Sequence, residues 1–285
     1  MRKKPNTRLL IRLARSAGFC FGVRRALDMA LETARSRRRV FMLGDIVHNE
    51  DVAGTMRRAG IAKIRRLRKG RDAVLLVRAH GTPQRILRRA LSSGYTIVDA
   101  TCPMVKHIHA IARRREALGD RIIIIGDKRH DEVIGIIGQL KKKALVLDTC
   151  ANIPRLKGVR RAAVVVQSTQ RIENALTIVK ALKKRVTKLV FFNTVCRPTR
   201  IKQEEIKRMP TDNDLMLVIG SKTSANTRRL YEISKSLNPR SYWVQSRRDI
   251  DPRWFRGVSS VGITAGASTP DETIAEVVSY LKTSR

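Results

Sequence analysis

Short apolar runs alternate with longer amphipathic segments along the chain. Between most of the runs, apolar residues recur at helical spacing with arginine and lysine opposite, as at Val23, Ala26, Leu27 and Ala30. Strands that alternate with helices predict βαβ units, so we expect an α/β protein with mainly parallel sheets. The predicted strands are Leu9–Ala14, Val40–Leu43, Ala73–Val77, Tyr95–Val98, Arg121–Ile125, Ala144–Leu147, Ala162–Val166, Leu189–Phe192, Leu215–Ile219, Ser241–Val244 and Val258–Ile263. Thr82 is a predicted helix N-cap, and the helix that follows His130 is predicted to run through Leu140.

Three cysteine turns divide this alternation into three rounds of similar length. Cys20, Cys102 and Cys196 each follow a strand-like run and precede a helical pattern. We therefore expect three small α/β units in a pseudo-threefold arrangement around a central site. Pro103, directly after Cys102, suits the first turn of a helix, where the helix dipole favours a thiolate. The predicted units are residues 1–101, 102–193 and 194–285.

Several polar motifs also lie between a strand and a helix. In open parallel sheets this position is the carboxyl edge, where ligands bind. Histidines at three such turns favour an anion or substrate site, although a single histidine is more often structural. Serine and asparagine before a helix either donate hydrogen bonds to phosphate oxygens or cap the helix. An acidic residue at such a position is either a proton donor or an ordinary acidic residue of the first helical turn. The residues are His48, His80, His130, Ser224, Asn226, Ser268 and Glu132.

Cysteine usage leaves two interpretations. The four cysteines lie far apart and form no Cys-x-x-Cys pair, which disfavours a disulfide framework and a structural zinc site. Three thiolates on separate loops can hold a 4Fe-4S cluster whose fourth iron stays open for a substrate oxygen. Spacing alone favours the alternative, three buried and inert thiols. The fourth cysteine, Cys150, has no assigned role.

The net charge of +36 points first to nucleic acid. Lysine and arginine are nevertheless spread over nearly every predicted helix, and aromatic residues are 4% of the chain, too few for base-stacking platforms. A basic, solvated surface is the simpler interpretation, and nucleic acid is not the expected partner. No apolar run reaches the length of a membrane span, and the basic start Met1–Pro5 lacks the apolar core of a leader, so we expect a cytoplasmic protein without a membrane partner.

Taken together and in order, the motifs resemble the 4-hydroxy-3-methylbut-2-enyl diphosphate reductase family over almost the whole chain. The resemblance implies the last step of the non-mevalonate isoprenoid route, which removes the allylic hydroxyl of that diphosphate to give isopentenyl and dimethylallyl diphosphate. It also implies one 4Fe-4S cluster and a ferredoxin or flavodoxin as electron donor. The motifs are Gly18-Phe19-Cys20, Val47-His48-Asn49, Ala79-His80-Gly81, Asp99-Ala100-Thr101-Cys102-Pro103, His130-Asp131-Glu132-Val133, Gly220-Ser221-Lys222 and Thr264-Ala265-Gly266-Ala267-Ser268.

The family's residue roles carry over position by position. The resemblance implies that Cys20, Cys102 and Cys196 ligate the cluster, with the substrate hydroxyl on the open iron. It implies that Glu132, assisted by the hydroxyl of Ser168, protonates the leaving oxygen, with His130 near the reacting part of the substrate. The residues implied in substrate binding are His48, His80, His130, Ser168, Ser224, Ala225, Asn226 and Ser268.

The chain departs from the family's pattern at three positions. Ser168 stands where threonine is usual and keeps the hydroxyl. Ala225 replaces a second serine, which removes one phosphate donor, and Lys202 replaces an arginine, which keeps the charge but loses the planar fork. Two other functions stay open on the residues alone: a nucleic-acid-binding protein on a retired enzyme fold, and a non-redox iron-sulfur dehydratase.

Overall fold

The computed structural model describes residues 9–36 and 39–283, so the basic segment Met1–Pro5 lies outside the described residues. The chain divides into two compact units. One unit runs from Phe21 to Cys196, and the other combines the two ends of the chain, up to Cys20 and from Arg197 onward. Within the described ranges, no helix is long and apolar enough to cross a membrane.

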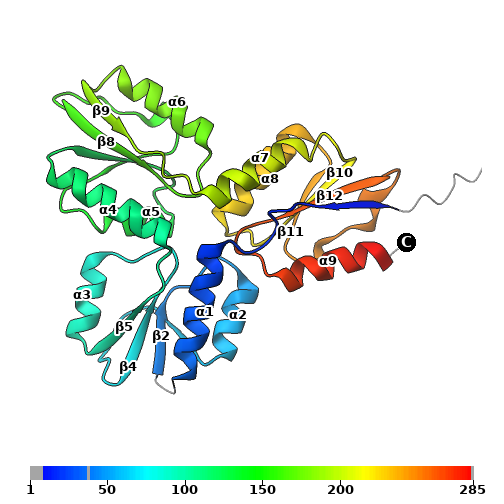
Figure 1. Cartoon of the computed structure of the whole chain (residues 1–285), viewed down its shortest axis with the longest axis horizontal. Coiled ribbons are helices and arrows are strands. Elements are labelled where there is room, and N and C mark those ends of the chain that lie inside the picture. Colours follow the sequence, from blue (N-terminus) through cyan, green and yellow to red (C-terminus); the bar gives the residue numbers. More distant parts are fainter. Residues whose placement is uncertain (1–8, 37–38, 284–285) are drawn as a thin grey trace, which may run out of the picture. The chain divides into compact units, whose positions relative to one another are not determined.

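Three parallel four-stranded sheets carry the fold (Figure 1). Two of them lie in the unit Phe21–Cys196, and the third lies in the unit formed by the chain ends. In spatial order the sheets are β3 (Ala62–Ile64), β2 (Arg39–Leu43), β4 (Ala73–Val77) and β5 (Tyr95–Asp99); β7 (Leu145–Leu147), β6 (Arg121–Ile125), β8 (Arg161–Val166) and β9 (Lys188–Phe191); and β11 (Ser241–Val244), β10 (Leu215–Ile219), β12 (Ser260–Ala265) and β1 (Leu10–Leu13).

The three sheets share one topology, and β1 completes the third sheet. It pairs in parallel with β12, with Leu10 opposite Ser260, in the way that β5 pairs with β4 and β9 with β8. The chain therefore enters this sheet at its edge strand and supplies the other three strands more than 200 residues later. The prediction of an α/β fold with parallel sheets is confirmed. The ranges 1–101, 102–193 and 194–285 and the pseudo-threefold arrangement stay predictions.

Helices follow the strands as the apolar periodicity indicates. In α1, for example, Gly22, Ala26 and Ala30 recur every four residues and form the buried face. Asn49 caps α2, because its side-chain oxygen accepts the backbone N–H of Val52 at 3.0 Å. The α-helices are α1 (Phe21–Arg35), α2 (Glu50–Arg58), α3 (Gln84–Ser92), α4 (Pro103–Ala117), α5 (Asp131–Ile137), α6 (Ile172–Lys183), α7 (Arg197–Arg208), α8 (Ala225–Leu237) and α9 (Asp271–Thr283).

Helices on both faces of the sheets explain the continuous apolar strands. In β6, Ile123 and Ile125 pack in the core that includes α6, whereas Ile122 and Ile124 pack in the core that includes α4 and α5. A strand that is covered on both faces has no polar alternation, so it reads as an unbroken apolar run. These buried strands hold the loops at their carboxyl ends on a rigid base.

Apart from shifts of one or two residues at strand ends, the sequence-based elements differ from the structure in three places. The short strand β3 lies at the start of a basic stretch for which no strand was predicted. Thr82 was predicted to cap the next helix, but the capping position is Pro83, which makes no side-chain cap bond. The carbonyl of Thr82 instead accepts a hydrogen bond from Gln139. The helix predicted to reach Leu140 ends at Ile137, with Gly138 at its C-cap.

Candidate functional site

Each of the three sheets has a cysteine at the equivalent position of its topology. The edge strands β1, β5 and β9 are each followed by one of the three motif cysteines. The backbone N–H of each cysteine donates to a carbonyl in the loop after the neighbouring strand, because the parallel pairing continues beyond the strand ends. The pairs are Cys20 with Ala267 (3.2 Å), Cys102 with Ala79 (3.0 Å) and Cys196 with Ser168 (3.0 Å).

Each of these cysteines also stands at the start of a helix. Cys102 is the N-cap residue of α4, and Cys20 and Cys196 directly precede α1 and α7. The helix dipole at this position favours a thiolate. All four cysteines lie in the described part of the chain, where they are partly buried and form no disulfide. Thiolates are the ligands that iron-sulfur clusters select, so this donor set fits a 4Fe-4S cluster with three protein ligands.

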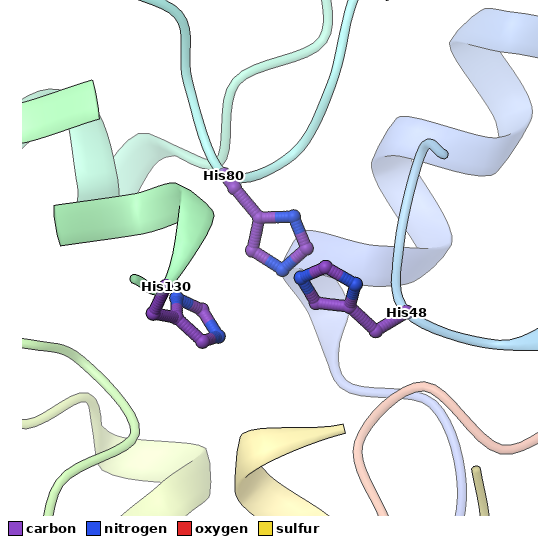
Figure 2. A group of neighbouring side chains, drawn as sticks. All are labelled: His48, His80 and His130. Carbon is purple, nitrogen blue, oxygen red and sulfur yellow. The ribbon is translucent and has the colours of Figure 1, made fainter. Parts of the chain in front are cut away.

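Three of the five histidines meet within the unit Phe21–Cys196 (Figure 2). His48 follows β2, His80 follows β4 and His130 follows β6, so the three come from two sheets. The ring centroids of His48 and His80 are 4.6 Å apart, and that of His130 is 5.4 Å from each. One ring nitrogen from each histidine lies within 4.8 Å of the others. The three predicted turns therefore bring their side chains together, and we call His48, His80 and His130 the histidine trio.

The hydrogen bonding of the trio suits an anion better than a metal ion. Nδ1 of His130 accepts the backbone N–H of Glu132 at 3.1 Å, so a neutral ring carries its proton on Nε2, where it donates rather than ligates. Burial lowers the pKa of His48 and lowers that of His80 well below its ordinary value, and the charge of Arg78 adds to both effects. His48 and His80 are therefore neutral at pH 7, and a bound anion would draw protons onto them.

Glu132 and Ser168 form a direct pair. The Glu132 side chain, in the first turn of α5, is 1% exposed. Its Oε1 accepts the backbone N–H of Ser168 at 2.6 Å, and its Oε2 accepts the Ser168 hydroxyl at 2.7 Å. The carbonyl of Ser168 accepts the N–H of Cys196. One serine thus links the candidate acid to a candidate cluster ligand.

The phosphate candidates lie in the other unit, at the carboxyl ends of the paired strands β10 and β12. Ser224 caps α8, because its hydroxyl accepts the N–H of Thr227 at 3.3 Å, and Ala225 is the first residue of that helix. Ser268 follows β12 and is buried. Asn226 is 4% exposed, yet neither atom of its side-chain amide has a hydrogen-bond partner. An unpaired buried amide is costly, so Asn226 indicates a ligand that would satisfy it.

Lys202 holds the turn that carries Cys20. Its ammonium, on a side chain 2% exposed, donates to the carbonyls of Ser16, Gly18 (3.1 Å) and Ala265 (3.2 Å). Burial lowers the pKa of Lys202 to about 8, an effect opposed by the negative charge of Cys20. The lysine that departs from the family's arginine therefore has a defined place, as a clamp on backbone carbonyls.

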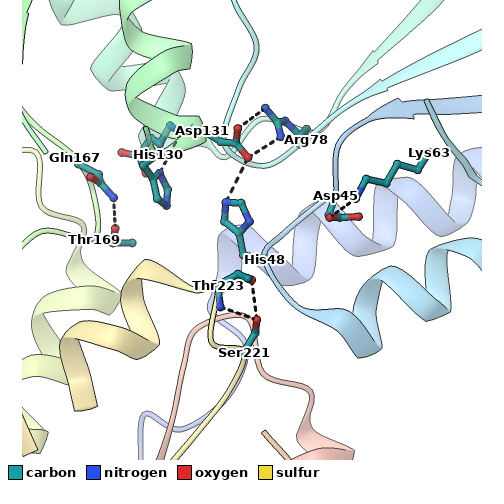
Figure 3. Close-up of polar contacts among 11 residues, drawn as sticks. Asp45, His48, Lys63, Arg78, His130, Asp131, Gln167, Thr169, Ser221 and Thr223 are labelled. Atoms are coloured by element: carbon teal, nitrogen blue, oxygen red, sulfur yellow. Dashed lines mark hydrogen bonds and ion pairs between the residues drawn. The ribbon is translucent and has the colours of Figure 1, made fainter. Parts of the chain in front are cut away.

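Sequence reasoning missed two residues beside the histidine trio. Arg78 and Asp131 form a bidentate ion pair, and Asp131 also contacts His48 (Figure 3). Arg78 comes two residues before His80, and Asp131 directly follows His130, which is the only signal the sequence offers for either role. The two residues are 53 positions apart, so no local pattern pairs them.

Comparison with known proteins decides the family. The family model described as LytB protein matches residues 11–282. The chain belongs to the LytB family. Among LytB relatives, the 4-hydroxy-3-methylbut-2-enyl diphosphate reductase of Pelobacter propionicus is 37% identical over 93% of this chain and 95% of its own. The protein of the same name from Aquifex aeolicus is 37% identical over 95% of each chain.

Solved structures of LytB relatives share the fold. A structure of (E)-4-hydroxy-3-methyl-but-2-enyl diphosphate reductase, described as the terminal enzyme of the non-mevalonate pathway, is 36% identical. It aligns with a TM-score of 0.73 over 96% of this chain and 99% of its own. The reductase of Plasmodium falciparum is 26% identical and aligns with a TM-score of 0.88 over 95% of this chain and 87% of its own. The family resemblance read from the motifs is thereby confirmed.

Proposed function

We propose that this chain is a 4-hydroxy-3-methylbut-2-enyl diphosphate reductase that holds one 4Fe-4S cluster on Cys20, Cys102 and Cys196. The observation that carries the proposal is the repeated placement of a cysteine after the edge strand of each of the three sheets and directly before a helix. Three equivalent thiolates supply three cluster ligands and leave one iron open. Membership in the LytB family supports the same reaction.

The diphosphate binds to neutral and positive hydrogen-bond donors. The Nε2–H of His130 is directed by the bond at Nδ1, and His48 and His80 take up protons as the anion arrives. Asn226 satisfies its unpaired amide on a phosphate oxygen, together with Ser224 and Ser268. Ala225 offers no hydroxyl, so its contribution is limited to the backbone at the start of α8.

The reaction consumes two electrons and two protons for each C–O bond that breaks. The cluster, when bound, supplies the electrons and a Lewis-acidic iron for the substrate oxygen. Glu132 delivers a proton to the leaving oxygen through the hydroxyl of Ser168, which lies 2.7 Å from its carboxyl group, and water leaves. The second proton enters at either end of the allyl unit, which gives isopentenyl or dimethylallyl diphosphate. His130 orients the diphosphate beside this step.

The electrons come from an acidic carrier of the ferredoxin or flavodoxin type. The net charge of +36 supports such a donor, because opposite charges accelerate encounter. The cytoplasmic location stays a prediction from the sequence.

Purification without oxygen tests the cluster. We expect about four irons per chain, with the iron lost in each of the variants Cys20→Ser, Cys102→Ser and Cys196→Ser. Cys150→Ser is the matched control and keeps its iron, because Cys150 lies in a short helical turn and packs against an apolar core. Iron that survives in any of the first three variants contradicts the ligand set. A substrate that is converted without added electrons would instead select a dehydratase.

A further inference from the structure

We propose that the Arg78–Asp131 ion pair positions the histidine trio for diphosphate binding. The inference rests on the proposed function, and it adds two residues that the reaction itself does not use. Neither residue is a catalytic group, since neither is needed to touch the substrate. Their role is to fix the three imidazoles relative to one another.

The pair joins the two sheets of the unit Phe21–Cys196 at the point where the histidines meet (Figure 3). Arg78 directly follows β4, and Asp131 opens α5 after β6. Nη1 of Arg78 lies 2.7 Å from Oδ2 of Asp131, and Nη2 lies 2.9 Å from Oδ1. Parallel contacts of this kind are both strong and directional, because the guanidinium fork matches the carboxylate. The separation between the loops of His80 and His130 is therefore set by this pair.

His48 is attached to the same carboxylate. Its Nε2 lies 3.4 Å from Oδ2 of Asp131, the oxygen that also faces Nη1 of Arg78. The third ring is thus oriented by the pair that links the other two loops. All three participants are partly exposed, with Arg78 at 16%, Asp131 at 23% and His48 at 24%. These contacts are therefore partly shielded from solvent.

The loop that carries His48 is shaped around Arg78. Gly44 directly follows β2 with a φ of +85°, and a Cβ at this glycine would lie 2.5 Å from Nη1 of Arg78. Any other residue would be strained at this φ, and the Arg78 guanidinium would have to move to make room for its Cβ.

A positioning role and a purely electrostatic role predict opposite results for Asp131. Removing a carboxylate near an anion site strengthens anion binding if only charge matters. If the carboxylate holds the rings in place, its removal weakens binding instead. Asp131 also lies in the first turn of α5, where an acid stabilises the helix, but that effect alone changes stability and leaves binding unchanged.

The test measures binding of inorganic pyrophosphate to the cluster-loaded protein, together with kcat and KM for the diphosphate substrate. We expect Asp131→Asn and Arg78→Gln each to weaken pyrophosphate binding and raise KM by about tenfold, with kcat within about twofold. The double variant should be no worse than either single variant, because the two residues act as one unit. Asp131→Glu and Arg78→Lys keep the charges and should restore part of the loss.

Lys63→Gln is the matched control. Lys63 forms a comparable ion pair with Asp45 at 2.7 Å but is 57% exposed, so its loss should leave binding unchanged. The iron content and the thermal midpoint of each variant show whether it has folded. Nitrogen chemical shifts of the histidine rings give a second readout, and they should change for His48 in Asp131→Glu as well as in Asp131→Asn.

Unchanged or tighter pyrophosphate binding by folded Asp131→Asn overturns the inference, as do additive effects of the two variants. The parent protein separates this failure from failure of the proposed function. If the parent binds pyrophosphate but reduces no substrate, the proposed function is wrong and the positioning role can still be read from binding. If the parent is active and the variants bind normally, the positioning role alone is wrong.

Discussion

His109 lies beneath the turn that presents His80. It belongs to α4, is buried, and has no hydrogen-bond partner at Nε2. Gly81 adopts a φ of +80°, and a Cβ at this position would lie 2.7 Å from the imidazole of His109. The imidazole therefore fills the space under the turn and supports it by packing. Burial, reinforced by the charge of Arg113, lowers the pKa of His109 from 6.5 to about 4.

Because the His109 imidazole is buried, we expect the free energy of unfolding to fall in acid. Between about pH 6.5 and 4 the unfolded chain binds a proton that folded His109 does not, so stability is full above this window and falls as the pH drops through it. The loss amounts to about 2 kcal/mol by pH 5, at 1.36 kcal/mol per pH unit. His109→Gln should therefore show a smaller difference in unfolding free energy between pH 7 and pH 5, as measured by denaturant unfolding.

His107 provides the control for this experiment. It lies on the same helix two residues earlier and is exposed. His107→Gln should keep the parent's pH dependence. If His109→Gln keeps the parent's pH dependence as well, the assigned protonation of His109 is wrong.

Among the secondary-structure elements, α7 holds the Cys20 turn in place through its side chains. Lys202 reaches from this helix to the carbonyls of Ser16 and Gly18 and to the end of β12 at Ala265. The turn has no regular secondary structure between β1 and Cys20. Glu205 of the same helix also accepts the backbone N–H groups of Arg15 (2.6 Å) and Ser16 (3.1 Å), and the Cys20–Ala267 bond adds a further support. At the first cysteine, contacts from a helix are thus added to the continued strand pairing that holds all three cysteines.

Replacement of Lys202 should weaken both stability and cluster binding. Lys202→Met leaves three carbonyls without their donor, and we expect a loss of about 2 kcal/mol in unfolding free energy together with a lower iron content. Lys202→Arg keeps the charge and most of the donors, and we expect iron content close to the parent's. Thermal unfolding and iron analysis measure the two effects.

Lys235→Met is the control for this clamp. Lys235 also donates to a backbone carbonyl, that of Pro239, but is exposed, so its loss should change stability by less than about 0.5 kcal/mol. Equal effects of Lys202→Met and Lys235→Met would show that the buried position of Lys202 has no special importance for the cysteine turn.

The whole molecule carries an excess of positive charge, with 60 lysine and arginine residues against 24 aspartate and glutamate residues. Such an excess attracts anions of any kind over distances of about 10 Å at moderate salt. It therefore suits a diphosphate substrate and an acidic electron carrier alike. The net charge alone does not distinguish between these two partners. A series of ionic strengths does, because long-range electrostatic steering is strongest between two macromolecules.

Turnover should depend on salt only when a protein supplies the electrons. With an acidic ferredoxin or flavodoxin, we expect kcat/KM for the donor to fall by about tenfold or more as ionic strength rises from low to high. With a small chemical reductant in place of the protein donor, the rate should change far less. Steady-state rates across a salt series measure both. A flat rate with the protein donor would contradict steering by the basic surface.

The order of strands and helices, and the positions that face the ligand edge, can be read directly from the amino-acid pattern. Parallel strands all end on one side of a sheet, so a polar residue after a strand must lie at that edge whatever the packing of the rest. This reasoning correctly brought His48, His80 and His130 together. The pairing of Glu132 with Ser168, which the structure also shows, was implied by the family resemblance instead. The meeting of the three motif cysteines at one cluster remains a prediction.

The distant residues that support these positions are identified only in the packed fold. Strand β1 joined a sheet whose other strands begin at Leu215, and Lys202 found carbonyls 184 and 186 residues away. The pairing of Arg78 with Asp131 was equally hidden. Among so many basic residues, the sequence gives each acid dozens of possible partners of the right sign. The basic residue that pairs with a given acid is determined by the distance and the geometry between the two side chains. Both are established only when the sheets have packed.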